Sequence, residues 1–382
     1  MPAWVPGLSF AGMKRALVSV TNDLATDNRV ARTCGVLTEL GYEVLLVGRR
    51  LPGSLPVERP YKTRRLRLLF NKGPLFYAEY NLRLFFLLLF SPCTLLFSND
   101  LDTLLPNYLA ARLRGKKLVY DTHEFYTEVP ELVGRLRVRA VWLAIERRIF
   151  PKLKHVITVN QSIANAYRER YGNEVMVVRN IPMPRELAPA PSRAELGLPT
   201  GKRILVMQGA GINVQRGAEE AVLAMKELPD CLMLIIGGGD AWPVLERMVQ
   251  EHGLQDRVRL IGKMPYARMM DYTRNADLGL TLDKDTNLNY RFSLPNKLFD
   301  YLHAGIPVLA TDLPEVAAIV RAHDCGVVLP AADPAAITGA VRALFIGPDR
   351  YAALRRNAIF AASKLDGTQE TGKLRSILER LG

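Results

Sequence analysis

The sequence predicts two successive α/β domains, each built on a doubly wound parallel sheet. Short apolar segments alternate with segments of helical periodicity along the 382 residues. The apolar segments end at polar or glycine-rich turns, which is typical of buried strands. The alternation stops once, at a proline-rich stretch, and then starts again. A chain that alternates in this way forms a parallel sheet covered on both faces.

The first half of the chain opens with a βαβ pattern. A β-branched run at 15–20 ends at polar Thr21-Asn22-Asp23, and an amphipathic segment from 27 to 40 follows. Gly41 ends this segment before the apolar run at 43–48, as expected for a helix that leads into a strand. Further strands are expected at 94–98, 117–120, 155–159 and 175–179, and further helices at 101–114 and 136–150.

Five prolines between 182 and 201 predict an interdomain linker. Strands are then expected at 204–209, 231–239, 258–262, 278–282, 306–311 and 326–330, with helices at 217–227 and 243–252. We therefore assign residues 1–182 to an N-terminal domain, 183–202 to a hinge and 203–368 to a C-terminal domain. The last segment, 369–382, is an amphipathic helix that we expect to pack back on the first domain.

Composition excludes several classes of protein. With 49% hydrophobic and 23% charged residues the chain is globular, not disordered. Its four cysteines form no CxxC pair, so neither a zinc site nor a disulfide framework is expected. The net charge is +13, and residues 1–190 hold 28 Lys and Arg against 16 Asp and Glu. This basic half is expected to face an anionic partner, such as membrane lipid, a phosphorylated acceptor or nucleic acid.

No segment of the sequence is expected to span a membrane. The longest unbroken apolar run, Leu84–Phe90, has seven residues, whereas about 20 are needed to cross a bilayer. The first residues, MPAWVPGLSFAG, lack a basic region, so we expect no signal peptide and a cytoplasmic location.

Residues suited to anions follow several strands of the second domain. Gly237-Gly238-Gly239 ends the strand at 231–239, and such glycines allow phosphate to approach backbone N–H groups. The GxGxxG fingerprint is absent, which disfavours an NAD-dependent oxidoreductase. Arg216 begins the helix at 217–227, where a cation opposes the helix dipole unless it serves an anion. The alternative is an exposed surface arginine.

The most informative segment is YRFSLPNKLFDYLHAGIPVLATD at 290–312. Pro295 is expected in the first turn of a helix, which places Lys297 beside free backbone donors. Asp300 lies one turn further along, where a carboxylate can accept two hydroxyl hydrogens from a sugar. The alternative for these two residues is an ordinary surface ion pair of neighbouring helix positions.

This segment resembles the donor-binding signature of the family-four glycosyltransferases, through Ser293–Tyr301 followed by Ala304–Val308. The resemblance implies the GT-B fold, in which two Rossmann-like domains face each other across a cleft. It also implies a retaining transferase that uses a nucleotide sugar. The other resembling segments, in the family's order, are Arg29-Val30, Gly41–Val44, Tyr120–Glu124, Glu146-Arg147, Val159–Ser162, Arg179-Asn180, Gly209 with Arg216-Gly217, and Ile236–Gly239.

The resemblance assigns roles residue by residue. Arg216 and Lys297 would hold the donor diphosphate, Asp300 would hold the ribose, and Met264 lies where family members contact the base through the backbone. His123 would be the catalytic residue that approaches the transferred sugar. The remaining donor-side candidates are Gly209, Gly238, Ser293 and Asn296, and the acceptor-side candidates are Asn22, Asp23 and Glu124.

Two positions depart from the family pattern. Phe292 stands where the family has the first glutamate of its E-x7-E pair, which puts a carboxylate contact to the transferred sugar in doubt. Ala210 stands where many members have a basic residue, so Arg216 and Lys297 would neutralise the diphosphate alone. An inactive member of the family is therefore one alternative.

We expect neither a metal ion nor a resident cofactor, because cations and helix N-termini can stabilise the leaving diphosphate. Two Asp-x-Asp pairs occur, but Asp100 is interpreted as a helix N-cap and Asp283 as a loop residue. The co-substrate would be a UDP- or GDP-linked sugar. His123 has an alternative role as a helix cap.

A basic cluster precedes an apolar stretch at 73–97 in the first domain. A cluster of cations beside an apolar helix is typical of a membrane-surface contact. This predicts a peripheral protein on the inner face of the plasma membrane that acts on a lipid-linked or cell-envelope glycan acceptor in polysaccharide biosynthesis. The alternative is that Phe85–Phe90 is buried and the cations are solvated. The residues of the predicted membrane or anion patch are Arg64, Arg65, Arg67 and Lys72.

Other functions remain as alternatives. Nucleic-acid binding is disfavoured, because no basic motif with interleaved aromatic residues is present. A GT-B-fold sugar-nucleotide epimerase would share the architecture, and a non-catalytic partner would bind the nucleotide sugar without turnover.

Overall fold

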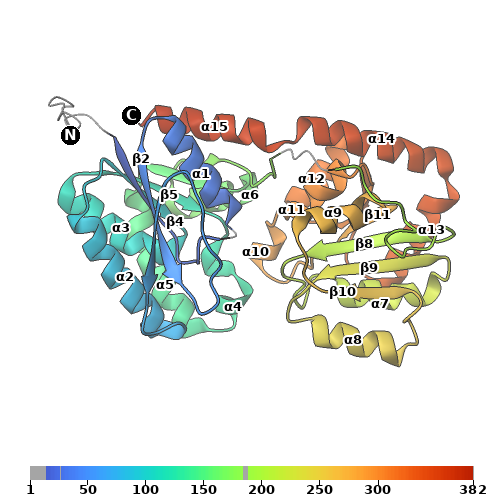
Figure 1. Cartoon of the computed structure of the whole chain (residues 1–382). Helices are drawn as coiled ribbons and strands as arrows, with labels where there is room; N and C mark the ends of the chain where they lie inside the picture. Colours follow the sequence, from blue (N-terminus) through green and yellow to red (C-terminus); the bar gives the residue numbers. More distant parts are fainter. Residues whose placement is uncertain (1–13, 26, 184–187, 382) are drawn as a thin grey trace, which may run out of the picture. The chain divides into compact units, whose positions relative to one another are not determined.

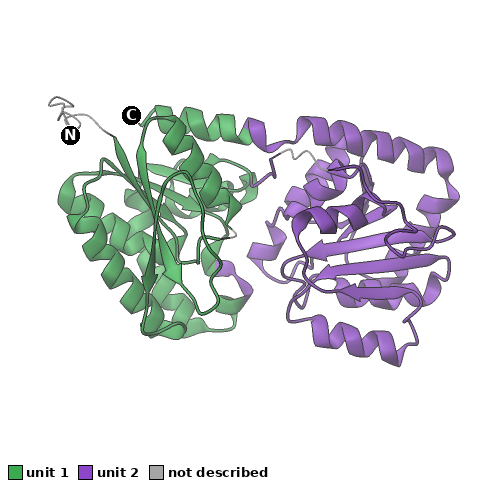
Figure 2. Ribbon diagram, in the orientation of Figure 1, with its two compact units in different colours: residues 1–127, 131–179, 370–382 green, residues 128–130, 180–369 purple. Residues whose placement is uncertain are grey.

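The computed structural model describes residues 14–25, 27–183 and 188–381. It divides into two compact units, residues 1–127, 131–179 and 370–382 in the first and residues 128–130 and 180–369 in the second (Figure 2). The segment MPAWVPGLSFAG and part of the proline-rich hinge, residues 184–187, lie outside the described residues. Each unit is built on its own parallel sheet (Figure 1).

The first unit contains a seven-stranded sheet in the order β3-β2-β1-β4-β5-β6-β7, with every pair parallel. Its strands are β1 Arg15–Ser19, β2 Glu43–Arg50, β3 Lys62–Arg67, β4 Leu95–Asn99, β5 Lys117–Thr122, β6 His155–Thr158 and β7 Met176–Val177. Its helices are α1 Asn28–Glu39, α2 Gly73–Phe90, α3 Leu101–Arg114, α4 Pro130–Val133, α5 Leu136–Ile149 and α6 Gln161–Tyr171, with short 3-10 turns at Tyr126–Glu128 and Phe150–Lys152.

Successive residues of the first unit's strands enter two different cores. Ala16 and Val18 of β1 pack with α1, whereas Leu17 between them packs with α2 and α3. This alternation is the two-residue period of a strand, and it requires an apolar layer on each face. The expectation of a sheet covered on both sides is therefore confirmed.

The second unit contains a six-stranded parallel sheet in the order β10-β9-β8-β11-β12-β13. Its strands are β8 Arg203–Gly209, β9 Cys231–Gly237, β10 Val258–Ile261, β11 Leu278–Thr281, β12 Val308–Thr311 and β13 Gly326–Leu329. Its helices are α7 Ala218–Ala224, α8 Trp242–Glu251, α9 Tyr266–Arg274, α10 Leu288–Arg291, α11 Asn296–His303, α12 Pro314–His323, α13 Pro334–Ile346 and α14 Pro348–Lys364, with a 3-10 turn at Met225–Glu227.

The final helix, α15 Gly367–Glu379, begins in the second unit and runs into the first. Leu374, Leu378 and Leu381 are buried in the core that α1 covers. An ion pair between Arg375 and Glu39 at the end of α1 adds a surface contact. The last residues of the chain thus complete the apolar core of the first unit.

Two differences from the sequence-based expectations concern an edge strand and the start of a helix. β3, Lys62–Arg67, was not expected as a strand, because its residues KTRRLR carry no apolar pattern. It pairs with β2 at the edge of the sheet, where charged residues are common because they discourage pairing with other chains. α11 begins at Asn296, so Pro295 precedes the helix rather than lying in its first turn.

Candidate functional site

The second unit brings cations to the switch point of its sheet. The strand order places β8 between β9 and β11, and the chain reverses direction of winding between β8 and β11. Ligands of doubly wound sheets bind beside the carboxyl ends of the strands at this point. The segment after β8 carries Arg216, and the segment after β11 carries Asp283.

Arg216 and Lys297 meet at the buried carboxylate of Asp283. Arg216 Nη1 lies 3.2 Å from Asp283 Oδ1, and Lys297 Nζ lies 3.8 Å from Oδ2. The side chain of Asp283 is 1% exposed and that of Lys297 is 10% exposed. Two cations around one carboxylate leave a net positive charge, which is the electrostatic requirement for binding an anion.

The pKa of Lys297 is lowered from its usual value. Burial lowers the pKa most, Asp283 opposes this effect, and the charge of Arg216 lowers it further. The guanidinium of Arg216 also lies 4.6 Å from the ring centre of Tyr290, a cation–π contact that fixes its plane. A site with these two cations would gain stability from a bound anion, because the anion would relieve their mutual repulsion.

Asp300 occupies a hydrogen-bonded position at the same end of the sheet. Its Oδ2 accepts from Gln208 Nε2 at 3.0 Å, and its Oδ1 accepts from Tyr266 Oη at 2.8 Å. These two contacts orient the carboxylate, and each of its oxygens is a hydrogen-bond acceptor. The helix that carries it is set close to the sheet, because a Cβ at Gly279 would lie 2.3 Å from the ring of Tyr301.

The glycines at the end of β9 were expected to let phosphate approach the backbone, and they also have a structural role. A Cβ at Gly237 would lie 1.8 Å from the carbonyl oxygen of Gly209, and one at Gly239 would lie 2.2 Å from that of Ile212. These two glycines therefore make room for the neighbouring segment after β8. At Gly238 a Cβ would meet only the flexible Lys263 side chain, at 3.0 Å.

The other donor-side candidates, and the two positions that depart from the family pattern, differ in their environments. Met264 is half-buried against the core beneath α11. The Oγ of Ser293 is buried without a hydrogen-bond partner among the described residues. Asn296 is exposed as the first residue of α11, and Phe292 is half-buried at the end of α10. Ala210 is exposed after β8.

In the first unit His123 is held between two carboxylates. Its backbone N–H donates to Asp100 Oδ1 at 2.8 Å, and its Nδ1 lies 3.3 Å from Asp100 Oδ2. Its Nε2 lies 3.5 Å from Asp121 Oδ2. Burial alone would lower the pKa of His123, but Asp100 and Asp121 outweigh it and raise the pKa to about 9. The imidazole is therefore a cation at neutral pH and can donate hydrogen bonds.

Asp121 is fixed in turn by Arg29 of α1. The Nε and Nη2 of Arg29 donate to the two carboxylate oxygens of Asp121 at 3.0 and 2.6 Å, and both side chains are buried. Burial would raise the pKa of Asp121, but Arg29 and His123 lower it to about 2. This paired fork is the strongest form of ion pair and holds Asp121 against the ring of His123.

Asp100 has an unusual backbone conformation. Its φ of 59° and ψ of 166° lie in a region that only glycine adopts readily. It stands at the N-cap position of α3, as expected, but its side chain makes no capping bond and instead holds His123. Such strain is found at functional sites, where the surrounding structure stabilises it.

The acceptor-side candidates form local bonds near the ends of β1 and β5. Asn22 donates to Asp27 at 2.6 Å and accepts from the Leu24 N–H, while Asp23 accepts from the Ala25 N–H. Glu124 is exposed. The structure therefore brings Asp100, Asp121 and Arg29 to His123. The sequence feature that could have identified them is their position: Asp100 follows β4, Asp121 lies near the end of β5, and Arg29 lies in α1.

The predicted membrane or anion patch lies on the edge strand β3 and at the start of α2. Arg64 and Arg67 are exposed, and Lys72 precedes α2 without capping it. Arg65 donates to the Leu55 carbonyl. The apolar helix beside them is neither wholly buried nor wholly exposed. Its inner stripe is Phe76, Tyr80, Leu84 and Leu88, and its outer stripe includes Leu75, Leu82, Phe86 and Phe90.

Among the described residues, no group of three or more His, Cys, Asp or Glu is arranged to hold a metal ion. No helix in the described ranges is long and apolar enough to span a bilayer. The four cysteine thiols are free and buried.

Two family models match the chain. Residues 27–181 match the model described as Glycosyltransferase Family 4, and residues 190–359 match the model described as Glycosyl transferases group 1. Comparison with curated proteins finds no match.

Solved structures share the fold at low identity. Sucrose-phosphate synthase from Thermosynechococcus elongatus is 18% identical with a TM-score of 0.81, over 96% of this chain and 99% of that one. HepE from Anabaena, in complex with UDP and glucose, is 14% identical with a TM-score of 0.73, over 96% and 100%. WaaG, a glycosyltransferase involved in lipopolysaccharide biosynthesis, is 14% identical with a TM-score of 0.69, over 95% and 99%.

Proposed function

The chain belongs to the family-four type of glycosyltransferases with the GT-B fold, and from this premise we propose its reaction in more detail. It transfers a sugar from a UDP- or GDP-linked donor, with retention of the anomeric configuration and without a metal ion. The acceptor is a lipid-linked or cell-envelope glycan at the surface of a membrane.

The proposed donor site rests on one observation, namely that Arg216 and Lys297 both lie beside the carboxylate of Asp283. The two cations would bind the donor diphosphate and stabilise the negative charge that develops on it as the sugar leaves. Asp300, oriented by Gln208 and Tyr266, would accept the ribose hydroxyl hydrogens. Structures of HepE in complex with UDP, and with UDP-glucose, support this choice of ligand class.

A metal ion is not needed in this arrangement. In metal-dependent transferases a divalent cation neutralises the diphosphate, and here the two side chains and the N-terminus of α11 would supply that positive charge. We therefore expect full activity in the presence of EDTA.

His123 would act as a hydrogen-bond donor to the transferred sugar. Its pKa of about 9 makes it a poor base at neutral pH, because the ring nitrogens already carry protons. This role suits a retaining transferase, in which the enzyme mainly positions and stabilises the reacting groups.

The membrane proposal rests on the outer stripe of α2 and the cations near its start. Leu82, Phe86 and Phe90 are 58%, 48% and 77% exposed on one face of this helix. Phe86 and Phe90 stack on each other with ring centres 6.3 Å apart. An apolar stripe of this kind can enter the interface of a bilayer, while nearby cations contact anionic lipid. This would bring the protein to a lipid-linked acceptor on the inner face of the plasma membrane.

The test is a thermal-shift screen of UDP, GDP, ADP, CMP and their sugar conjugates, followed by product analysis. A ligand at about 100 times its Kd should stabilise the wild type by about 2.7 kcal/mol. We expect one nucleotide class to stabilise the wild type, and Lys297→Ala to lose that shift. Lys226→Ala, an exposed lysine of the same unit, is the matched control.

The products distinguish the alternatives. A new glycoside with retained configuration, seen by NMR of the anomeric proton, supports the proposal. An isomerised sugar nucleotide formed without acceptor would identify an epimerase. Donor binding without turnover on lipid-linked acceptors would identify a non-catalytic partner, and the absence of any nucleotide shift would contradict the donor site.

A further inference from the structure

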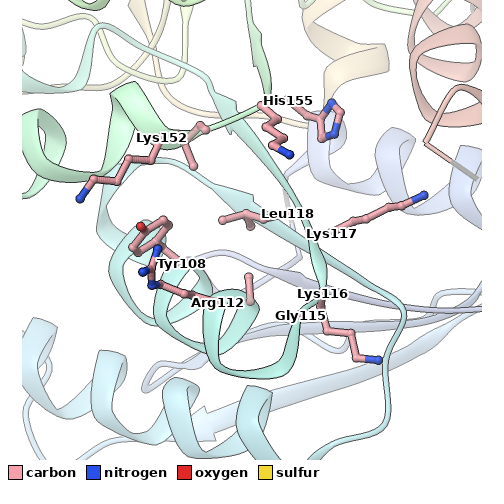
Figure 3. A pocket seen from close by; sticks show the side chains of 11 residues that line it. Tyr108, Arg112, Gly115, Lys116, Lys117, Leu118, Lys152 and His155 are labelled. Carbon is pink, nitrogen blue, oxygen red and sulfur yellow. The ribbon is translucent and has the colours of Figure 1, made fainter.

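A basic pocket lies in the first unit at the end of the sheet opposite to His123. It has a volume of about 430 Å³ and is lined by residues at the end of α3, the starts of β5 and β6, and the 3-10 turn after α5 (Figure 3). Substrates of doubly wound sheets bind at the carboxyl ends of the strands. Because this pocket is at the amino ends of β5 and β6, the reaction proposed above does not use it.

The lining of the pocket is cationic. Its eleven lining residues include five Lys and Arg, one His and no carboxylate. Figure 3 shows Arg112 and Lys152 on one side of Leu118, with Lys116 and Lys117 on the other side. Leu118, Leu153 and Ala111 contribute an apolar floor. A ligand with charged oxygens and a small apolar or ring portion matches these surroundings.

The cations of the pocket are mostly uncompensated. The ammonium of Lys117 donates a hydrogen bond to the carbonyl oxygen of Leu381. Within the described residues, the side chains of Arg112, Lys116, Lys152 and Lys154 make no ion pair or hydrogen bond. Burial lowers the pKa of His155, and Lys117 and Lys154 lower it further, which agrees with a positive potential in the pocket.

Cations often lie at helix C-termini, where they stabilise the helix dipole, but this explains only some of the cations in the pocket. α3 ends at Arg114, and the 3-10 turn after α5 ends at Lys152, so one cation at each end would complement the helix dipoles. At the end of α3 this role is taken by Arg114, which bonds the Leu88 carbonyl and is not part of the pocket. The four remaining cations of the lining, Arg112, Lys116, Lys117 and Lys154, surround the same hollow, and a bound anion would offset their like charges.

We propose that this pocket binds a phosphorylated ligand that carries at least two negative charges, at a site separate from the donor site. Arginine forks and lysine ammonium groups are the side chains that recognise phosphate oxygens. The same chemistry is offered by a free polyphosphate or phosphorylated metabolite and by the headgroup of an anionic phospholipid. The experiment below distinguishes these two sources.

The probes are tripolyphosphate, measured by calorimetry, and vesicles of phosphatidylcholine with and without phosphatidylglycerol, measured by co-sedimentation. The full chain is compared with an Arg112→Ala/Lys116→Ala/Lys152→Ala variant. The matched control, Lys226→Ala/Arg247→Ala/Arg356→Ala, removes three exposed cations from the second unit. Circular dichroism and thermal melting check that each variant is folded.

We expect the pocket variant to bind at least one probe roughly tenfold or more weakly, and the control variant to bind as the wild type does. Loss of tripolyphosphate binding supports a free ligand, and loss of vesicle binding alone supports a lipid headgroup. Equal losses in both variants would mean a general effect of net charge and would overturn the proposal, as would unchanged binding of both probes.

Two local measurements separate this pocket from the donor site. The bound probe should protect Lys116 and Lys152 from amine-labelling reagents but leave Lys226 reactive. It should also raise the pKa of His155, because a nearby anion favours the charged ring. Lys297→Ala should leave both signals intact, and a protection pattern that depends on Lys297 would overturn the proposal of a separate pocket.

Discussion

At both candidate centres, the key side chains lie beside side chains of opposite charge. In the first unit the positive ring of His123 is balanced by Asp100 and Asp121, and Arg29 balances Asp121. In the second unit the arrangement is reversed, because one carboxylate, Asp283, lies beside two cations, Arg216 and Lys297, and the group keeps a net positive charge. The first centre is prepared to donate protons in hydrogen bonds, and the second to accept an anion.

The charge of His123 predicts a pH-dependent stability. Its pKa rises from 6.5 to about 9 on folding, so its contribution is fully present below pH 6.5 and is lost as the pH rises through 9. The shift corresponds to about 3 kcal/mol. Urea unfolding of the wild type and His123→Ala should show the largest difference at low pH and a smaller one at high pH, and NMR titration should give the pKa directly.

His252→Ala, which changes an exposed histidine of the second unit, is the control for this measurement. A titration of His123 near its usual pKa of about 6.5 would show that the two carboxylates do not hold it as a cation. In that case the imidazole would be neutral under assay conditions, and the proposed role of His123 as a cationic hydrogen-bond donor would be wrong.

At the scale of the element, helix α2 of the first unit has two apolar faces. The inner stripe of α2 packs on the sheet through Phe76, Tyr80, Leu84 and Leu88, and the outer stripe is exposed. The alternative that Phe85–Phe90 is buried is thus correct for Leu88 but wrong for Phe86 and Phe90, which are exposed. Periodicity could not separate the faces, because both are apolar.

The two stripes of α2 predict opposite effects of mutation. Phe86→Ser/Phe90→Ser should reduce binding to anionic vesicles while changing the free energy of unfolding little, because these side chains contact mainly solvent. Leu84→Ala should reduce the free energy of unfolding by about 2–5 kcal/mol, because it leaves a cavity in the core. Vesicle co-sedimentation and urea unfolding measure the two effects. Retained vesicle binding by the double variant would contradict the membrane proposal.

At the scale of the whole molecule, residues distant in sequence form one core. Leu374 and Leu378 of α15 are buried with residues of β1, β2 and α1. The first unit therefore requires the last residues of the chain, which are made after the second unit. A chain that ends before α15 would expose the apolar surface that these leucines cover.

This arrangement predicts that a substitution near the C-terminus destabilises the N-terminal unit. Leu378→Ala should reduce the free energy of unfolding of the first unit by about 2–5 kcal/mol, since its side chain is 1% exposed. Hydrogen exchange of β1 and α1 amides should report the loss. Ser376→Ala, exposed on the same helix, is the control, and equal exchange in the two variants would contradict a shared core.

The sequence by itself determined the fold class, most strands and the family. Buried parallel strands are continuous apolar runs, and the motif at 293–308 is local, so both are visible without coordinates. The edge strand β3 was missed because an edge strand buries little and needs no apolar pattern. The proposed roles of the site residues remain predictions.

Only the tertiary structure decided which charges meet. Asp283 follows β11 and was expected only as a loop residue, yet it joins Arg216 and Lys297 from two other segments. Asp100 was expected as a helix cap, yet its carboxylate holds His123. The basic pocket likewise gathers Arg112, Lys116 and Lys152 from separate elements. Such contacts depend on the order of strands in a sheet, and no local pattern of residues encodes that order.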